Sequence, residues 1–171
     1  LTNRGITKSQ AEHFGFFFCR DGRYHNRLVL PIFDHCQRYR SFQARTIVYD
    51  EPKYQNPRGA QLSRLLYGLS WNFRKRNRVI LVEGIFDAIH VFPYGVASFS
   101  KNISDTQIQL LRLSGCTEIV ICWDNDAWSV TPEKWENAVV RLSRYFIVRE
   151  IKLPDGDPTN YSIAELKQMI I

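Results

Sequence analysis

The apolar positions of residues 1–77 predict a small unit of mixed secondary structure. A short helix is expected over 8–13, and strand-like apolar runs follow it at 16–18, 28–30 and 44–49. Leucines recur at helical spacing across 60–71 and predict an amphipathic helix there. Turn-forming residues separate these elements at 50–52 and 56–59. We therefore expect a mixed α+β subdomain in this part of the chain.

From residue 78 onward, strand patterns alternate with helix patterns. Short apolar runs predict strands at 79–82, 95–98, 118–123 and 146–153. Helices are expected at 86–91, 104–113, from 132 through Leu142, and at 163–169. Two helix starts carry recognisable caps, a capping box at 104–107 and the pair Thr131-Pro132. The fold class predicted for 78–171 is α/β, a small parallel sheet with helices on both faces.

The composition is that of an ordinary soluble globular protein. The chain has 171 residues, of which 44% are hydrophobic and 23% charged. Its apolar runs are strand-sized and too short to cross a membrane. The four cysteines form no C-x-x-C pair, which favours reduced thiols and a cytoplasmic location. Because the first residue is Leu1 and no signal pattern follows it, we expect a fragment of a longer protein.

The net charge of +6 is unevenly distributed along the chain. Residues 1–80 contain 15 Lys or Arg against 5 Asp or Glu, whereas 81–171 contain 8 against 12. Aromatic and amide side chains interleave with the basic residues over 38–45, a composition suited to phosphate contacts and base stacking. A solvated basic face would give the same totals. With that interleaving, the first half is interpreted as a surface for a polyanion.

Acidic residues follow three of the four predicted parallel strands. They are Glu83 after the first strand, Asp124 and Asp126 after the third, and Asp155 and Asp157 after the fourth. Asp87 lies one helical turn beyond Glu83. Each acid alone would be commonplace in a cap or a turn. Because the carboxyl ends of parallel strands share one edge, the set together predicts a site for a hard divalent cation, Mg²⁺ or Mn²⁺.

These strand ends resemble the Toprim domain, which bacterial-type primases share with topoisomerases and some nucleases. The family is marked by Glu-Gly after the first strand and by D-x-D after the third, here Glu83-Gly84 and Asp124-Asn125-Asp126. The resemblance implies a Rossmann-like Toprim domain at 78–171, preceded by a smaller basic α+β subdomain at 1–77.

Further segments resemble the primase form of this domain. Residues 82–88 are similar to its Glu-Gly motif with the following Asp, and 153–158 to its Leu-Pro-Asp-Gly stretch. The first half resembles the primase polymerase domain in chain order at 4–6, 11–15, 27–32, 42–45, 53–57 and 66–68. The resemblance therefore covers nearly the whole chain, and it is to the RNA polymerase (catalytic) domain of a bacterial or phage DNA primase.

The resemblance implies a nucleotidyltransferase that makes short RNA primers on single-stranded DNA from ribonucleoside triphosphates. Its catalytic residues would be Glu83, Asp124 and Asp126, and these with Asp155 and Asp157 would hold Mg²⁺ or Mn²⁺. Glu83 would be either a ligand or the proton-transfer group. Nucleotide or template binding is expected from Arg27, Arg45, Lys53, Tyr54, Asn56 and Asp87. Two alternatives stay open here: Arg27 could be a solvated edge-strand charge, and Tyr54 and Asn56 could only pack a turn.

The sequence departs from the primase pattern at two places near the predicted site. Trp128 and Ser100 stand where the family usually has glycine, which affects the expected nucleotide affinity more than the fold. A Toprim nuclease and a non-catalytic DNA-binding fragment remain alternatives to the primase. The resemblance further implies a monomer that meets a replicative helicase through domains absent from this chain. Its divergent linking segments favour a phage origin.

Overall fold

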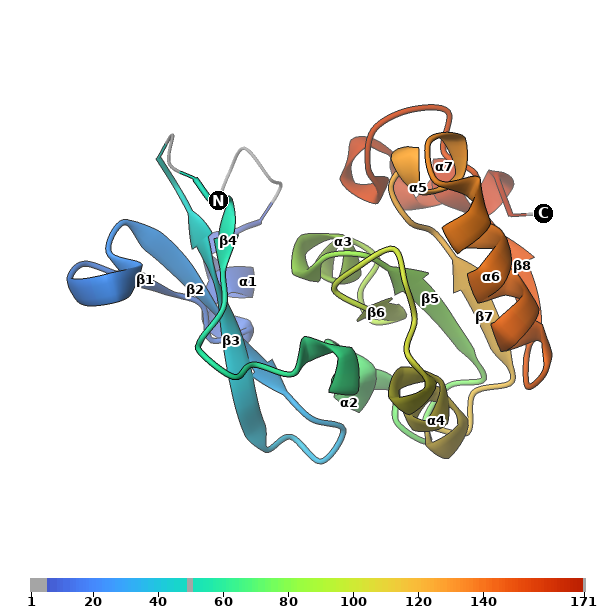
Figure 1. Cartoon of the computed structure of the whole chain (residues 1–171), viewed down its shortest axis with the longest axis horizontal. Helices are drawn as coiled ribbons and strands as arrows, with labels where there is room; N and C mark the ends of the chain where they lie inside the picture. Colours follow the sequence, from blue (N-terminus) through green and yellow to red (C-terminus); the bar gives the residue numbers. More distant parts are fainter. Residues whose placement is uncertain (1–5, 49–50, 171) are drawn as a thin grey trace. The chain divides into compact units, whose positions relative to one another are not determined.

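The computed structural model describes residues 6–48 and 51–170, which belong to two compact units, Leu1–Gln61 and Leu62–Ile171 (Figure 1). The predicted division into a basic subdomain at 1–77 and a Toprim domain at 78–171 stays a prediction. Within the described residues, no helix combines the length and the apolar character that a membrane span requires. The two units are considered in turn.

The first unit is a four-stranded antiparallel sheet with one short α-helix. Helix α1, Lys8–His13, begins at a capping box formed by Thr7 and Gln10. The strands pair in the order β1-β2-β3-β4 and span Phe17–Cys19, Arg27–Phe33, Tyr39–Thr46 and Tyr54–Gln55. A short 3-10 helix, Gly22–Tyr24, joins β1 to β2. Strand β2 is buried along all but its last residue, so it forms the centre of this unit.

The second unit is built on a four-stranded parallel sheet of order β6-β5-β7-β8. Its strands are β5, β6, β7 and β8, at Arg78–Val82, Gly95–Ala97, Glu118–Ile121 and Ile147–Glu150. The α-helices α2 to α7 are Leu69–Asn72, Ile85–His90, Asp105–Leu113, Asp126–Ser129, Pro132–Ser143 and Ile163–Gln168. Two 3-10 helices, η3 and η4, span Leu62–Arg64 and Pro158–Asn160. This is the predicted parallel α/β sheet flanked by helices.

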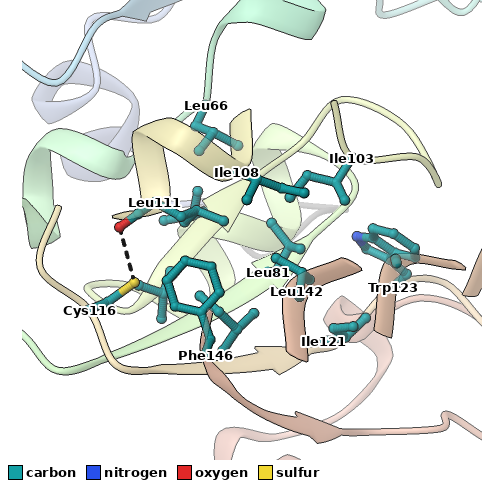
Figure 2. Packing of buried hydrophobic residues seen from close by; sticks show 14 of the residues in the cluster. Leu66, Leu81, Ile103, Ile108, Leu111, Cys116, Ile121, Trp123, Leu142 and Phe146 are labelled. Carbon is teal, nitrogen blue, oxygen red and sulfur yellow. Dashed lines mark hydrogen bonds between the residues drawn. The ribbon is translucent and has the colours of Figure 1, made fainter. Parts of the chain in front are cut away.

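Alternating strand residues bury both faces of this sheet. Leu81 and Ile121 pack against α4 and α6 in one hydrophobic cluster, together with Trp123 (Figure 2). Val82 and Val120 are equally buried but lie outside that cluster, as the two-residue period of a strand requires. The side chain of Trp123 is fully buried and meets Trp135 edge to face, so it packs in the core.

The amphipathic helix predicted over 60–71 is wrong. In its place, η3 and α2 are separated by a stretch in which Tyr67 forms an antiparallel bridge with Ala97, the last residue of β6. Two backbone hydrogen bonds of 3.0 and 3.1 Å join these residues. Gly68 then takes a left-handed conformation, with φ of 78°. Leu66 and Leu69 still enter the core, so the helical spacing of these two leucines reflected burial rather than a continuous helix.

Candidate metal centre

Three carboxylates meet at the carboxyl edge of the parallel sheet. Glu83 directly follows β5, and Asp124 and Asp126 follow β7, the strand paired with β5. One oxygen atom from each lies within 4.8 Å of the others. Glu83 and Asp124 are half-buried, and Asp126 is exposed. The structure thus brings together the three residues for which a catalytic role was predicted.

The turn after β5 is held in shape by Asp87. Its carboxylate is buried and accepts a hydrogen bond of 3.0 Å from the backbone N–H of Gly84, which caps α3. A Cβ atom at Gly84 would lie 2.7 Å from that carboxylate oxygen, so a larger residue would disturb the cap. Asp87 therefore fixes the direction in which Glu83 leaves the strand. A nucleotide-binding role for Asp87 stays a prediction.

The electrostatics of the edge oppose full ionisation of its acids. Burial raises the pKa of Glu83 to about 8, and the charges of Asp124, Asp126 and Asp87 act in the same direction against the opposing charge of Lys101. Oε1 of Glu83 is buried and, among the described residues, accepts no hydrogen bond. Closely spaced hard oxygen donors with an unsatisfied buried atom fit a divalent cation such as Mg²⁺ or Mn²⁺.

Lys101 also lies at this edge, although the sequence pattern did not predict it there. Its ammonium group forms an ion pair with Asp126, and its side chain is only 23% exposed. A signal was available, because Lys101 follows β6 and that parallel strand ends at the same edge as β5 and β7. A base at this position was not expected because only oxygen ligands of a cation were sought from the pattern of acids at the other strand ends.

Asp155 and Asp157 lie in a loop tied to the D-x-D turn, but they are not members of the three-carboxylate cluster. Asp155 accepts a hydrogen bond of 2.7 Å from the Tyr161 hydroxyl, and Asp157 caps η4. The tie comes from Asn125, whose backbone N–H donates to the Gly156 carbonyl at 2.8 Å. Metal binding by these two acids stays a prediction.

The Asn125 side chain reinforces this tie. Its Nδ2 donates to the carbonyls of Leu153 and Pro154 at 2.8 and 2.9 Å. Trp128, in the place of the usual family glycine, donates from Nε1 to the same Leu153 carbonyl at 3.1 Å. The middle residue of the D-x-D turn therefore anchors the loop that carries Asp155.

Asn125→Ala is expected to loosen this loop. Losing the two hydrogen bonds that Nδ2 donates to the loop, and the one that Oδ1 accepts from Ser129, should lower the free energy of unfolding by about 1–3 kcal/mol and speed amide hydrogen exchange at 153–157. Exchange followed by mass spectrometry and urea denaturation would check this. Asn137→Ala, at an exposed position on α6, is the matched control and should change neither quantity. Unchanged exchange at 153–157 in the Asn125 variant would contradict the anchoring role.

The predicted nucleotide- or template-binding residues of the first unit differ in how far they are buried. Arg27 is only 1% exposed and donates to the Pro52 carbonyl at 2.7 Å, which favours a positioning role for it. Arg45 and Tyr54 are half-buried and pair with each other across β3 and β4. The Arg45 guanidinium lies 4.9 Å from the centre of the Tyr54 ring and donates a hydrogen bond to the Tyr54 hydroxyl. Lys53 and Asn56 are exposed.

The sequence of the whole chain resembles those of known proteins. No family model matches the chain. The DNA primase of Geobacillus stearothermophilus is 30% identical over 151 residues, which cover 82% of this chain and 25% of the relative. That of Clostridium acetobutylicum is 30% identical over 177 residues, covering 94% and 29%. The chain is a homologue of the bacterial DNA primases. It spans about a quarter of the length of the primases it matches.

The primase fold is also found among solved structures. The zinc-binding and RNA polymerase domains of Aquifex aeolicus primase align with a TM-score of 0.83 at 24% identity, covering 98% of this chain and 53% of that one. A DnaG primase catalytic domain bound to single-stranded DNA aligns with a TM-score of 0.69 at 24% identity, covering 100% and 62%. The predicted resemblance to the primase catalytic domain is confirmed, and both units belong to its fold.

Proposed function

We propose that the chain is the RNA-synthesising core of a DNA primase, which joins ribonucleotides on a single-stranded DNA template. The observation that carries this proposal is the cluster of Glu83, Asp124 and Asp126 at the sheet edge of a primase fold. In this reaction a ribonucleotide 3′-oxygen attacks the α-phosphorus of an incoming triphosphate. The bond to the bridging oxygen of pyrophosphate breaks, and the hydroxyl proton passes to a base or to water.

Each carboxylate of the cluster has a proposed part in that reaction. Asp124 and Asp126 would hold Mg²⁺ or Mn²⁺, with Asp155 or Asp157 joining them if their loop moves inward. When bound, the ion neutralises triphosphate charge and polarises the reacting phosphorus. Glu83 either completes the ligand set or accepts the hydroxyl proton. Its raised pKa, about 8, supports the second role, because a base works best when its pKa is near the operating pH.

The first unit offers a surface for the template. Phe33 and Tyr39 are 40% and 58% exposed and contact each other edge to face, at the neighbouring ends of β2 and β3. Arg38 and Arg40 lie beside them, each 3.1 Å from the buried carboxylate of Asp34. Exposed rings next to anchored guanidinium groups suit base stacking and phosphate contact. We infer that this surface binds single-stranded DNA, while Arg45, Lys53, Tyr54 and Asn56 contact nucleotide or template.

Tyr39→Ala is expected to weaken binding of single-stranded DNA by about 1–3 kcal/mol, the cost of one lost base stack. Fluorescence anisotropy with a labelled oligonucleotide at fixed salt would measure it. Tyr145→Ala removes a ring that is 48% exposed on the second unit, and it should leave the affinity unchanged. Equal affinities for the wild type and the Tyr39 variant would remove this surface from the proposal.

A Toprim nuclease is the second candidate, because the same carboxylates could hold a metal that cleaves phosphodiesters. One reaction separates the two. End-labelled single-stranded DNA is incubated with ribonucleoside triphosphates and Mg²⁺ or Mn²⁺, and both the template and any RNA are analysed. New RNA with an intact template supports the primase, and a shortened template without RNA supports the nuclease. We further infer a monomeric replication protein of the cytoplasm, whose helicase contact lies in other parts of the primase; phage origin stays a prediction.

A further inference from the structure

The segment after β6 is hydrogen-bonded to the end of β5 and to Glu83, which follows it. The backbone N–H groups of Ser98 and Phe99 donate to the carbonyls of Val82 and Glu83 at 3.0 and 2.9 Å. The Ser98 hydroxyl bonds to the Ser100 carbonyl at 2.8 Å, which closes the next turn. The backbone that carries Lys101 is therefore fixed at the same edge as the acidic cluster.

Lys101 extends from this turn into the cluster. Its ammonium pairs with Oδ2 of Asp126, and its charge also opposes the rise in the pKa of Glu83. The side chain is 23% exposed, much less than a surface lysine on a solvated face.

The charges of the side chains at this edge indicate how many divalent ions it can hold. A bound divalent ion would favour the ionised forms of Glu83, Asp124 and Asp126, which then carry three negative charges, and the Lys101 ammonium cancels one of them. For these three acids, the remaining two charges match the charge of one divalent ion. A second divalent ion at Asp126 would compete with the ammonium group that already bonds to Oδ2 of this carboxylate and would be repelled by its charge.

We propose that Lys101 is a tethered cation of the metal centre, which takes the place of a second divalent ion at Asp126. The nucleotide-free centre therefore holds a single ion. This inference rests on the proposed function, because it presumes that the carboxylate cluster binds metal. It predicts that the number of ions bound is set by a side chain outside the acidic motifs.

The test is a Mn²⁺ titration of the metal-free chain, followed by the electron paramagnetic resonance signal of free Mn²⁺. The wild type is expected to bind one ion, and Lys101→Met is expected to bind a second or to bind the first about tenfold more tightly. Lys101→Arg, which keeps the positive charge, should bind one ion as the wild type does. Lys75→Met removes an exposed lysine before β5, at the opposite end of that strand, and should behave like the wild type.

Two outcomes overturn the proposal while leaving the metal centre in place. They are two ions bound by the wild type, and an unchanged number and affinity of ions in Lys101→Met with the fold confirmed by circular dichroism. If Lys101→Met does not fold, the wild-type count still decides. Absence of Mn²⁺ binding by both wild type and Lys101→Met would refute the metal centre itself, and the proposed function with it.

Discussion

Asp124→Asn is expected to lower RNA primer synthesis at least about 100-fold, more than the loss of a group that only orients a metal ligand. The side chain keeps its size, but the charge that would hold the cation is gone. Asp124 follows β7, an inner strand of the parallel sheet, so the backbone around it should stay in place. The initial rate of labelled ribonucleotide incorporation on single-stranded DNA measures the effect.

Glu136→Gln is the matched control for this substitution. It also neutralises one carboxylate in the second unit, at an exposed position on α6, and it should leave synthesis unchanged. Circular dichroism should be the same for all three proteins. Synthesis by Asp124→Asn at the wild-type rate would mean that the cluster does not carry the reaction.

Glu83→Gln is expected to stabilise the metal-free protein at alkaline pH. The pKa of Glu83 rises from its ordinary 4.5 to about 8 in the folded chain, so folding favours the protonated form. The stability that this provides is fully present below pH 4.5 and is lost as the pH rises through about 8. Glutamine is neutral throughout. At pH 9 the variant should therefore be more stable than the wild type by about 1–3 kcal/mol after solvent screening.

Urea denaturation of both proteins between pH 5 and pH 9 in EDTA would measure this difference. The advantage of the variant should vanish near pH 5. Saturating Mg²⁺ should reverse the order at pH 8, because the ion stabilises the folded wild type in proportion to its affinity. Parallel pH profiles for the two proteins would contradict the raised pKa, and Glu136→Gln again serves as the control for a lost exposed carboxylate.

Local patterns predicted the sheet and the meeting of its acids. The run from Val79 to Val82 is apolar because both faces of β5 are covered, and Glu83 ends the run where the buried strand ends. The same logic placed Asp124 and Asp126 after β7. Parallel strands place their carboxyl ends at the same edge of a sheet, whatever their order. These residues could therefore be expected at one edge before the strand order was known.

Long-range pairing decided what the sequence could not predict. The stretch 60–71 contains helical spacing, but Tyr67 gains two backbone hydrogen bonds from Ala97, thirty residues away, and the helix is interrupted. Arg27 sits in a polar context in the sequence and is buried by a contact with Pro52. The pairing of Lys101 with Asp126 likewise depends on β6 and β7 lying on either side of β5.

The proposed primase activity is tested most directly by template-directed RNA synthesis, compared between the wild-type chain and Asp124→Asn. Two single-stranded templates of different sequence are supplied with four ribonucleoside triphosphates and Mg²⁺ or Mn²⁺. Short, ribonuclease-sensitive products complementary to each template are expected, and they should disappear in EDTA and with Asp124→Asn. Mn²⁺ bound at the cluster without any RNA product, or products that persist in Asp124→Asn, would contradict the proposed primase activity.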